Sequence, residues 1–224
     1  MRGYFITGTD TGVGKTEIAC FIARTWRSRG LTVGACKPAE TGVVRDEPLD
    51  AAALAAAAGD ARTLDEICPY RFPESLAPAV AAKRAGVTID PARLLAAVEA
   101  AFRGRDRVIA ETAGGLLVPY ADGCDGIDLV VQSGLPTILV ARLALGTINH
   151  TRLSVEALKA RKVRIDAVVL SVGGDESAPP PGDIAAETNH AVLQAMLPGL
   201  PVVVFPLIDP RNPPRVPALE ALVV

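Results

Sequence analysis

The chain has 224 residues, of which 50% are hydrophobic and only 4% aromatic, and its formal net charge is −2 with a pI near 5.8. This length and composition fit an α/β fold with one core of aliphatic side chains, and we expect residues 1–224 to form a single domain. The weak negative charge argues against a nucleic-acid partner, and no apolar run reaches the roughly 18 residues that span a bilayer, so no membrane partner is expected.

Strands and helices are expected to alternate along the chain. The expected strands are 4–7, 31–36, 108–111, 137–141, 167–172 and 202–205. The expected helices are 15–29, 51–58, 91–102, 146–160 and 185–196. Gly114 and Gly115 should break the chain after the third strand, and a proline-rich loop at 179–181 should precede the last helix. Because the strands lack alternating polar residues, the pattern predicts a mostly parallel sheet with helices on both faces.

A glycine-rich loop joins the first expected strand to the first expected helix and reads GTDTGVGKT at 8–16. Its backbone N–H groups and the helix N-terminus would attract phosphate, Lys15 would reach the β- and γ-phosphates, and the Thr16 hydroxyl would bind Mg²⁺. The loop therefore predicts a P-loop NTPase-like fold that binds a nucleoside triphosphate. Five residues separate Gly8 from Gly14, where the usual pattern has four. A turn that merely connects a strand to a helix is the weaker alternative.

Three charged residues are expected near this loop. Glu111 and Lys37 end strands, and in an open α/β sheet ligands lie beyond the carboxyl ends of the strands. Glu111 is expected to bind Mg²⁺ directly or through water, with a solvent-exposed carboxylate as the alternative. Lys37 would add positive charge where a phosphoryl group meets an anionic acceptor. Asp50 is either an N-cap of the alanine-rich helix or a second magnesium carboxylate.

The four cysteines show neither paired CxxC spacing nor metal-ligand spacing, which is typical of reduced thiols in a cytosolic protein. The N-terminus does not resemble a signal peptide, because its apolar run is short and leads into the glycine-rich turn. We therefore expect a cytoplasmic protein.

Four segments in order make the chain resemble the dethiobiotin synthetase family. They are GTDTGVGKT at 8–16, KPAETG at 37–42, ETAGG at 111–115 and LGTINH at 145–150, and CPYRF at 68–72 followed by Ala77-Pro78 adds a fifth likeness. The five-residue gap in the phosphate loop also matches the family. The resemblance spans roughly residues 3 to 170.

The resemblance implies a ligase that uses ATP and Mg²⁺ to carboxylate 7,8-diaminononanoate (7,8-diaminopelargonate) with CO₂ and to close a cyclic urea in biotin biosynthesis. It implies a carbamate, then its mixed anhydride with phosphate, and a homodimer with shared active sites. The residues implied in catalysis are Lys37, Lys15 and Thr11. The residues implied in substrate binding are Thr11, Lys37, Thr41, Gly146, Thr147 and Asn149. The residues implied as metal ligands are Thr16, Asp50 and Glu111.

The residues implied in nucleotide binding are Gly12, Val13, Gly14, Lys15, Thr16, Glu17, Asp50, Glu111, Thr112, Ala113, Gly114, Pro206 and Leu207. Two positions depart from the family. Thr112 stands where the family commonly has Gly, so its side chain would either crowd the phosphates or contact them. The strand ending at Val172 lacks the Asn-Asp pair of some members, so base recognition would rest on the backbone at 171–174 and on Pro206 and Leu207.

Other function classes fit the sequence less well. A P-loop switch that moves cargo would carry an extra lysine early in the loop, where this chain has Thr9 and Asp10, and would not need Lys37. Another ATP-dependent amine or carboxylate ligase would keep the loop and Glu111 but change Lys37, Thr41 and Asn149. A non-catalytic nucleotide-binding module would not need the complete set of lysines and metal ligands.

Overall fold

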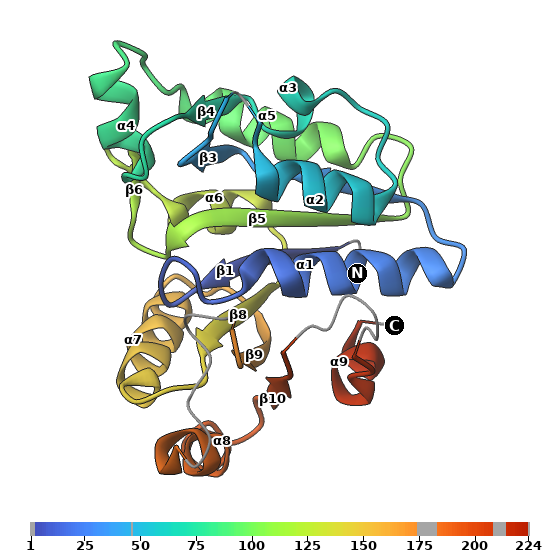
Figure 1. Cartoon of the computed structure of the whole chain (residues 1–224), viewed down its shortest axis with the longest axis vertical. Helices are drawn as coiled ribbons and strands as arrows, with labels where there is room; N and C mark the ends of the chain where they lie inside the picture. Colours follow the sequence, from blue (N-terminus) through green and yellow to red (C-terminus); the bar gives the residue numbers. More distant parts are fainter. Residues whose placement is uncertain (1–2, 46, 174–182, 208–213, 224) are drawn as a thin grey trace.

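Six parallel strands form the central sheet of the computed structural model, which describes residues 3–45, 47–173, 183–207 and 214–223 (Figure 1). The order of the strands across this sheet is β10-β9-β8-β1-β5-β2, and all neighbouring strands pair in parallel. The strands are β1 (Gly3–Gly8), β2 (Val33–Cys36), β5 (Arg107–Gly115), β8 (Thr137–Arg142), β9 (Ile165–Ser171) and β10 (Val202–Phe205). The expected α/β fold with a mostly parallel sheet is confirmed.

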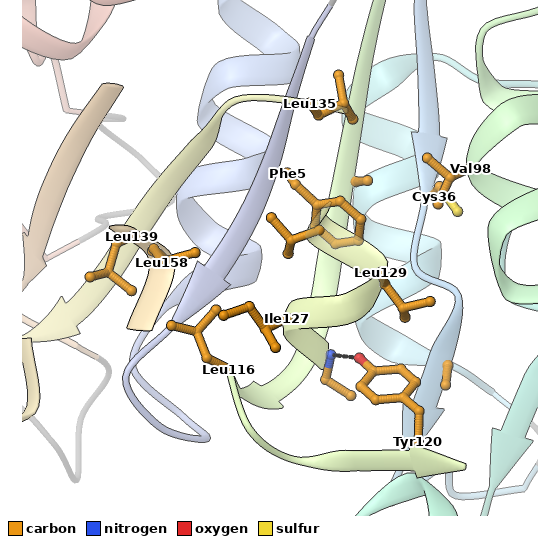
Figure 2. Packing of buried hydrophobic residues seen from close by; sticks show 14 of the residues in the cluster. Phe5, Cys36, Val98, Leu116, Tyr120, Ile127, Leu129, Leu135, Leu139 and Leu158 are labelled. Carbon is orange, nitrogen blue, oxygen red and sulfur yellow. Dashed lines mark hydrogen bonds between the residues drawn. The ribbon is translucent and has the colours of Figure 1, made fainter. Parts of the chain in front are cut away.

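Helices cover both faces of the sheet, as expected. One face packs against α5 (Pro91–Ala101), α6 (Gly126–Ser133), α7 (Thr147–Ala160) and α8 (Ile184–Met196). The other packs against α1 (Lys15–Ser28), α2 (Leu49–Ala58) and α9 (Pro217–Leu222). Successive strand residues face opposite sides of the sheet. Phe5 therefore packs in the core under α5–α8, and Tyr4 and Ile6 pack in the core under α1, α2 and α9. Figure 2 shows Phe5 beside Leu129 of α6.

Several short elements lie near the carboxyl ends of the strands or beside them. They are β3 (Ala39–Thr41), α3 (Leu64–Ile67), β4 (Tyr70–Phe72), α4 (Pro78–Arg84), β6 (Pro119–Ala121) and β7 (Cys124–Asp125). β3 pairs with β4 in parallel, and β6 pairs with β7 antiparallel. None of these elements, nor α6 and α9, was expected from the sequence, because each is too short to show a clear hydrophobic period.

Local sequence explains where most helices start and stop. Asp90 caps α5, since its Oδ1 accepts the N–H of Ala92 at 2.9 Å and Pro91 occupies the first helical position. The alanine-rich α2 ends at Gly59, whose φ of 60° lies in the left-handed region that suits a helix C-terminus. Asp183 caps α8 by accepting the N–H groups of the first turn.

The structure corrects two expectations about element ends. Asp50 is not an N-cap, because α2 begins at Leu49 and Pro48 holds the N-cap position. Gly114 and Gly115 do not end the third strand. They belong to β5, whose pairing with β1 continues past an irregularity to join Gly8 with Gly115. The absence of side chains allows this close approach, since a Cβ on Gly115 would lie 3.3 Å from the Thr9 carbonyl oxygen.

The remaining predicted helices and strands are found with their ends shifted by a few residues. The proline-rich loop at 179–181 and Gly174 lie outside the described residues. All four cysteines are buried and unpaired, and no described helix is long and apolar enough to cross a bilayer.

Candidate active site

The phosphate loop lies between β1 and α1, where the sequence predicted it. Gly12 and Gly14 have φ values of 69° and 92°, so the loop uses backbone conformations that other residues rarely adopt. Gly14 is the N-cap of α1 and no side chain caps the helix, which leaves the first N–H groups of α1 available to a phosphate. Lys15 is only 6% exposed, and its ammonium donates to the Asp10 carbonyl at 2.7 Å.

Four residues from distant parts of the chain meet at the carboxyl edge of the sheet. Lys37 follows β2, and its Nζ lies 2.8 Å from Asp50 Oδ2 and 2.6 Å from Glu111 Oε1. Thr16 Oγ1 donates to the same Glu111 oxygen at 2.9 Å. Glu111 and Lys37 are almost fully buried, whereas the Asp50 side chain is 47% exposed. The prediction that Lys37 and Glu111 meet is confirmed, but Glu111 does not end its strand: it lies inside β5, and the shorter β2 ends at Cys36, opposite Ala110.

Burial and neighbouring charges act against each other in this cluster. Burial alone would lower the pKa of Lys37, but the charges of Glu111 and Asp50 and their hydrogen bonds raise it well above its ordinary value. Burial alone would raise the pKa of Asp50, and Lys37 lowers it overall. Lys15 has less compensation, so burial lowers its pKa to about 8. Lys37 is thus a permanent cation, whereas Lys15 can lose its proton slightly above neutral pH.

The cluster supplies oxygen ligands that suit Mg²⁺. Thr16 offers a hydroxyl, Asp50 a half-exposed carboxylate, and Glu111 a buried carboxylate whose Oε2 has no hydrogen-bond partner. Hard cations prefer such oxygens, and a P-loop magnesium completes its shell with phosphate and water. Within the described ranges no group of three or more His, Cys, Asp or Glu side chains could hold a metal unaided. The three oxygen-bearing side chains therefore fit a hard cation whose remaining ligands are not side chains.

A cavity of about 660 Å³ opens between the phosphate loop, the end of β5 and the β3–α4 region. Its size lies in the range of sites that enclose a small molecule. The residues that line it are Thr11, Gly12, Gly14, Lys15, Thr16, Glu17, Lys37, Glu40, Thr41, Asp50, Ser75, Leu76, Ala77, Pro78, Glu111, Ala113, Gly114 and Val118. We call this the main cavity.

Comparison with known proteins places the chain in a family. A family model described as an AAA domain matches residues 2–206. The ATP-dependent dethiobiotin synthetase BioD of Anaeromyxobacter dehalogenans (strain 2CP-C) is 46% identical over 204 residues, covering 90% of this chain and 92% of the relative. The enzyme of the same name from Thermodesulfovibrio yellowstonii is 38% identical and covers 87% of this chain and 84% of itself. The chain belongs to the dethiobiotin synthetase family. The expected assignment to the ligases is thereby confirmed.

Solved structures confirm the fold. A ParA family ATPase from Chlorobium tepidum superposes with a TM-score of 0.55 at 15% identity, covering 99% of this chain and 88% of that one. The signal recognition particle receptor FtsY from Elizabethkingia anophelis gives a TM-score of 0.54 at 16% identity and covers 99% of this chain and 64% of its own. At such identities the likeness shows the P-loop NTPase-like fold alone.

One departure from the dethiobiotin synthetase pattern has a clear structural role. Thr112 is fully buried, and its Oγ1 donates to Thr7 Oγ1 at 3.1 Å between β5 and β1. The side chain does not line the main cavity, so it neither crowds a phosphate there nor offers it a hydroxyl. The next residue, Ala113, lines the cavity instead, and it donates its N–H to the buried Tyr120 hydroxyl at 2.5 Å (Figure 2).

The other expected residues lie outside the main cavity. Val13 is a buried residue of the phosphate loop, and Pro206 and Leu207 are exposed after β10. Gly146, Thr147 and Asn149 form the start of α7, with Asn149 exposed and Thr147 buried. In this single protomer they do not share a cavity with Lys37.

Glu40 is the main site residue that sequence reasoning missed. The residue is only 6% exposed, and its carboxylate accepts the N–H of Asp50 at 3.1 Å and that of Ala51 at 2.9 Å. Burial raises the pKa of Glu40, although these N–H donors oppose the shift. The residue lies in the KPAETG segment, but no spacing rule links it to a helix that starts nine residues later. Ser75, Leu76 and Val118 were missed for the same reason.

Proposed function

We propose that this chain uses ATP and Mg²⁺ to carboxylate 7,8-diaminononanoate with CO₂ and to close the cyclic urea of dethiobiotin. The observation that carries the proposal is the buried ammonium of Lys37 between Asp50 and Glu111, at the end of a cavity that also contains the phosphate loop. Family membership adds to it, because the relatives bear the name of this synthetase. The reaction consumes ATP, so a cytoplasmic enzyme is expected.

The proposed reaction has three steps. One substrate amine attacks CO₂, loses a proton and becomes a carbamate. A carbamate oxygen attacks the γ-phosphorus of ATP and ADP leaves, which gives a carbamic–phosphoric anhydride. The second amine attacks the carbonyl carbon, a five-membered urea closes, and phosphate leaves. No side-chain nucleophile is needed, so the protein's task is to position the reactants and stabilise charge.

The residues of the main cavity suit these steps. The attack of one anion on another requires nearby positive charge, which Lys15 supplies beside the phosphates and Lys37 beside the carbamate. Thr11 and Thr41 line the same cavity and offer hydroxyl groups to the carbamate and the amines. Mg²⁺, held by the ligands described above, would neutralise the β- and γ-phosphates when bound with ATP.

The main cavity also has apolar walls that suit the hydrocarbon chain of the substrate. Leu76, Pro78 and Val118 contribute to them. Apolar walls with a few polar groups at one end are typical of small-molecule sites. A substrate with two amines at one end and a carboxylate at the other would thus direct its carboxylate out of the cavity.

We further propose a homodimer in which the start of α7 in one protomer binds the substrate carboxylate in its partner's main cavity. The separation of Asn149 from Lys37 within one protomer supports this arrangement. Three large apolar side chains are exposed around the site, Leu117 at 63%, Leu145 at 88% and Leu153 at 63%, and a second copy would cover them. A symmetric dimer would complete both sites at once.

The direct test is phosphate release from ATP, Mg²⁺ and bicarbonate with and without 7,8-diaminononanoate, together with mass analysis of the product. Phosphate release that depends on the diamine, with a cyclic urea as product, supports the proposal. Hydrolysis independent of the diamine favours a switch ATPase. The absence of both reactions, with ATP still bound, favours a ligase for another amine or carboxylate.

A further inference from the structure

A second, smaller cavity lies on the other side of the phosphate loop from the main cavity. Its volume is about 100 Å³, and its walls come from the loop (Thr9, Asp10), from the end of β8 (Arg142) and from the start of α7 (Thr147, His150). Figure 1 shows α7 and the α4–β6 region on opposite sides of the loop that joins β1 to α1. The two cavities share no lining residue.

Arg142 is unusual among the partly buried arginines of the chain. Its Nε is buried and lacks a hydrogen-bond partner. Across the described residues its guanidinium forms no hydrogen bond or ion pair with the protein. Arg62 also has a buried nitrogen without a partner, Nη1, but its Nε and Nη2 bind the Asp60 carboxylate and the Ala35 carbonyl. Because the Arg142 side chain lines the cavity and has no partner among the described residues, an acceptor that enters the cavity would stabilise its charge.

The surroundings of Arg142 favour an anionic acceptor. The 14-residue α7 begins at Gly146, in the left-handed region with φ of 91°, and no side chain caps it, so its positive end is open to a ligand. Asn189 donates to the Ala144 carbonyl at 2.9 Å, which fixes the loop between Arg142 and α7. Asp10 is the one carboxylate that lines the cavity, and it is exposed and accepts the N–H of Thr11 at 2.7 Å.

We propose that Arg142 binds the substrate carboxylate and makes the enzyme specific for an acid rather than for a neutral diamine. A guanidinium can hold both oxygens of a carboxylate in a bidentate pair, and the open end of α7 adds attraction. This inference rests on the proposed function, and it adds Arg142 to the α7 residues expected at the carboxylate. In the proposed dimer the carboxylate belongs to the substrate in the partner's main cavity.

The test compares 7,8-diaminononanoate with its neutral carboxamide, 7,8-diaminononanamide, in wild-type protein and in Arg142→Gln. We expect the wild type to prefer the acid, and Arg142→Gln to lower kcat/KM for the acid by about tenfold to a hundredfold with little change for the amide. KM for ATP should stay within about twofold. Arg142→Lys should recover part of the preference, because it keeps the charge but not the bidentate geometry. Arg103→Gln, an exposed arginine beyond α5, is the matched control.

Three outcomes would overturn the inference. They are an unchanged preference for the acid in Arg142→Gln, an equal loss for acid and amide, and a loss confined to KM for ATP. Calorimetric binding of the acid and the amide, without turnover, separates this inference from the proposed function. If the wild type binds the acid through Arg142 but forms no urea, only the proposed reaction fails, and if it does not bind the acid, both fail.

Discussion

The buried carboxylate of Glu40 accepts the backbone N–H of Asp50 at 3.1 Å, across a chain separation of ten residues. Its other oxygen accepts the N–H of Ala51 at 2.9 Å. Pro48 holds the N-cap position of α2 and has no side chain that could do this. Glu40, in β3, therefore replaces the missing helix cap and sets the first turn of α2, which carries Asp50 to its place beside Lys37.

Replacing Glu40 should disturb both the fold and the proposed metal site. Glu40→Ala leaves two N–H groups of α2 without an acceptor and should lower the free energy of unfolding by about 1–3 kcal/mol. Because Asp50 then loses its fixed position, the Mg²⁺ concentration for half-maximal turnover should rise several-fold. Urea unfolding and a magnesium titration measure the two effects. Glu40→Gln, which keeps one acceptor oxygen, should fall between Glu40→Ala and the wild type, and an unchanged magnesium midpoint in Glu40→Ala would disprove the link to Asp50.

Removing the Lys37 ammonium should stop ring closure without unfolding the protein. Lys37→Ala takes away the charge beside the proposed carbamate, and losses of a preorganised charge of this kind are commonly about 100-fold to 1,000-fold in kcat. Nucleotide binding should persist, because Lys15 and the phosphate loop remain. Single-turnover phosphate release and equilibrium binding of ATP separate the two. Lys83→Ala, on the exposed side of α4, is the control, and turnover at the wild-type rate in Lys37→Ala would remove Lys37 from the reaction.

The core of this site could be predicted because of how a parallel sheet is built. Parallel strands in register bring Lys37, which follows β2, next to Glu111, which lies inside β5 opposite the last residues of β1. The glycines of the motif at 8–16 allow a tight turn, and the motif leads directly into a helix N-terminus. Such local and topological signals survive in a single sequence.

Contacts between distant side chains could not be predicted in this way. Nothing in the pattern shows that Glu40 caps α2, or that the Tyr120 hydroxyl accepts the Ala113 N–H. Whether the Thr112 side chain points into the main cavity or away from it depends on how β5 is aligned with β1, which places Thr112 next to Thr7. No spacing rule in the sequence gives that alignment. The sequence alone allows Asp50 to be either a helix cap or a metal ligand, because both roles fit the start of a helix. The position of Pro48 as N-cap excludes the capping role.

The edge of the sheet at β2 depends on Asp60. Its Oδ2 accepts the Ala35 N–H at 2.9 Å while Arg62 donates to the Ala35 carbonyl at 2.5 Å, so the two side chains satisfy the open backbone as a neighbouring strand would. Asp60→Ala should lower the free energy of unfolding by about 3 kcal/mol. The change leaves a buried N–H without its acceptor and removes the carboxylate that pairs with the nearby arginines. Chemical unfolding measures the loss. Asp65→Ala, an exposed aspartate of α3, should have little effect, and equal stability of both variants would argue against this role.

The affinity for ATP should fall as the pH rises through about 8. Burial lowers the pKa of Lys15 to about 8 in the free protein, so its ammonium is lost above that pH and the attraction for the phosphates weakens. Bound phosphates would raise the pKa again, so binding near pH 8 should take up a proton. Calorimetric titrations with a non-hydrolysable ATP analogue in buffers of different ionisation enthalpy detect that proton. Binding without proton uptake between pH 7.5 and 8.5 (roughly the window set by this pKa) would mean that Lys15 is already fully charged.

The proposed sharing of active sites between protomers can be tested by mixing two defective variants. Asn149→Ala should raise KM for the diamino acid more than KM for ATP, because Asn149 lies at the start of α7 and outside the main cavity. Lys37→Ala should be inactive. If Lys37 and Asn149 serve one site from different protomers, each mixed dimer contains one intact site. Random exchange of equal amounts then gives about a quarter of wild-type activity at low diamine concentration. If both residues serve one site from the same protomer, no mixed dimer has an intact site, and activity at low diamine should stay at the sum of the two variants.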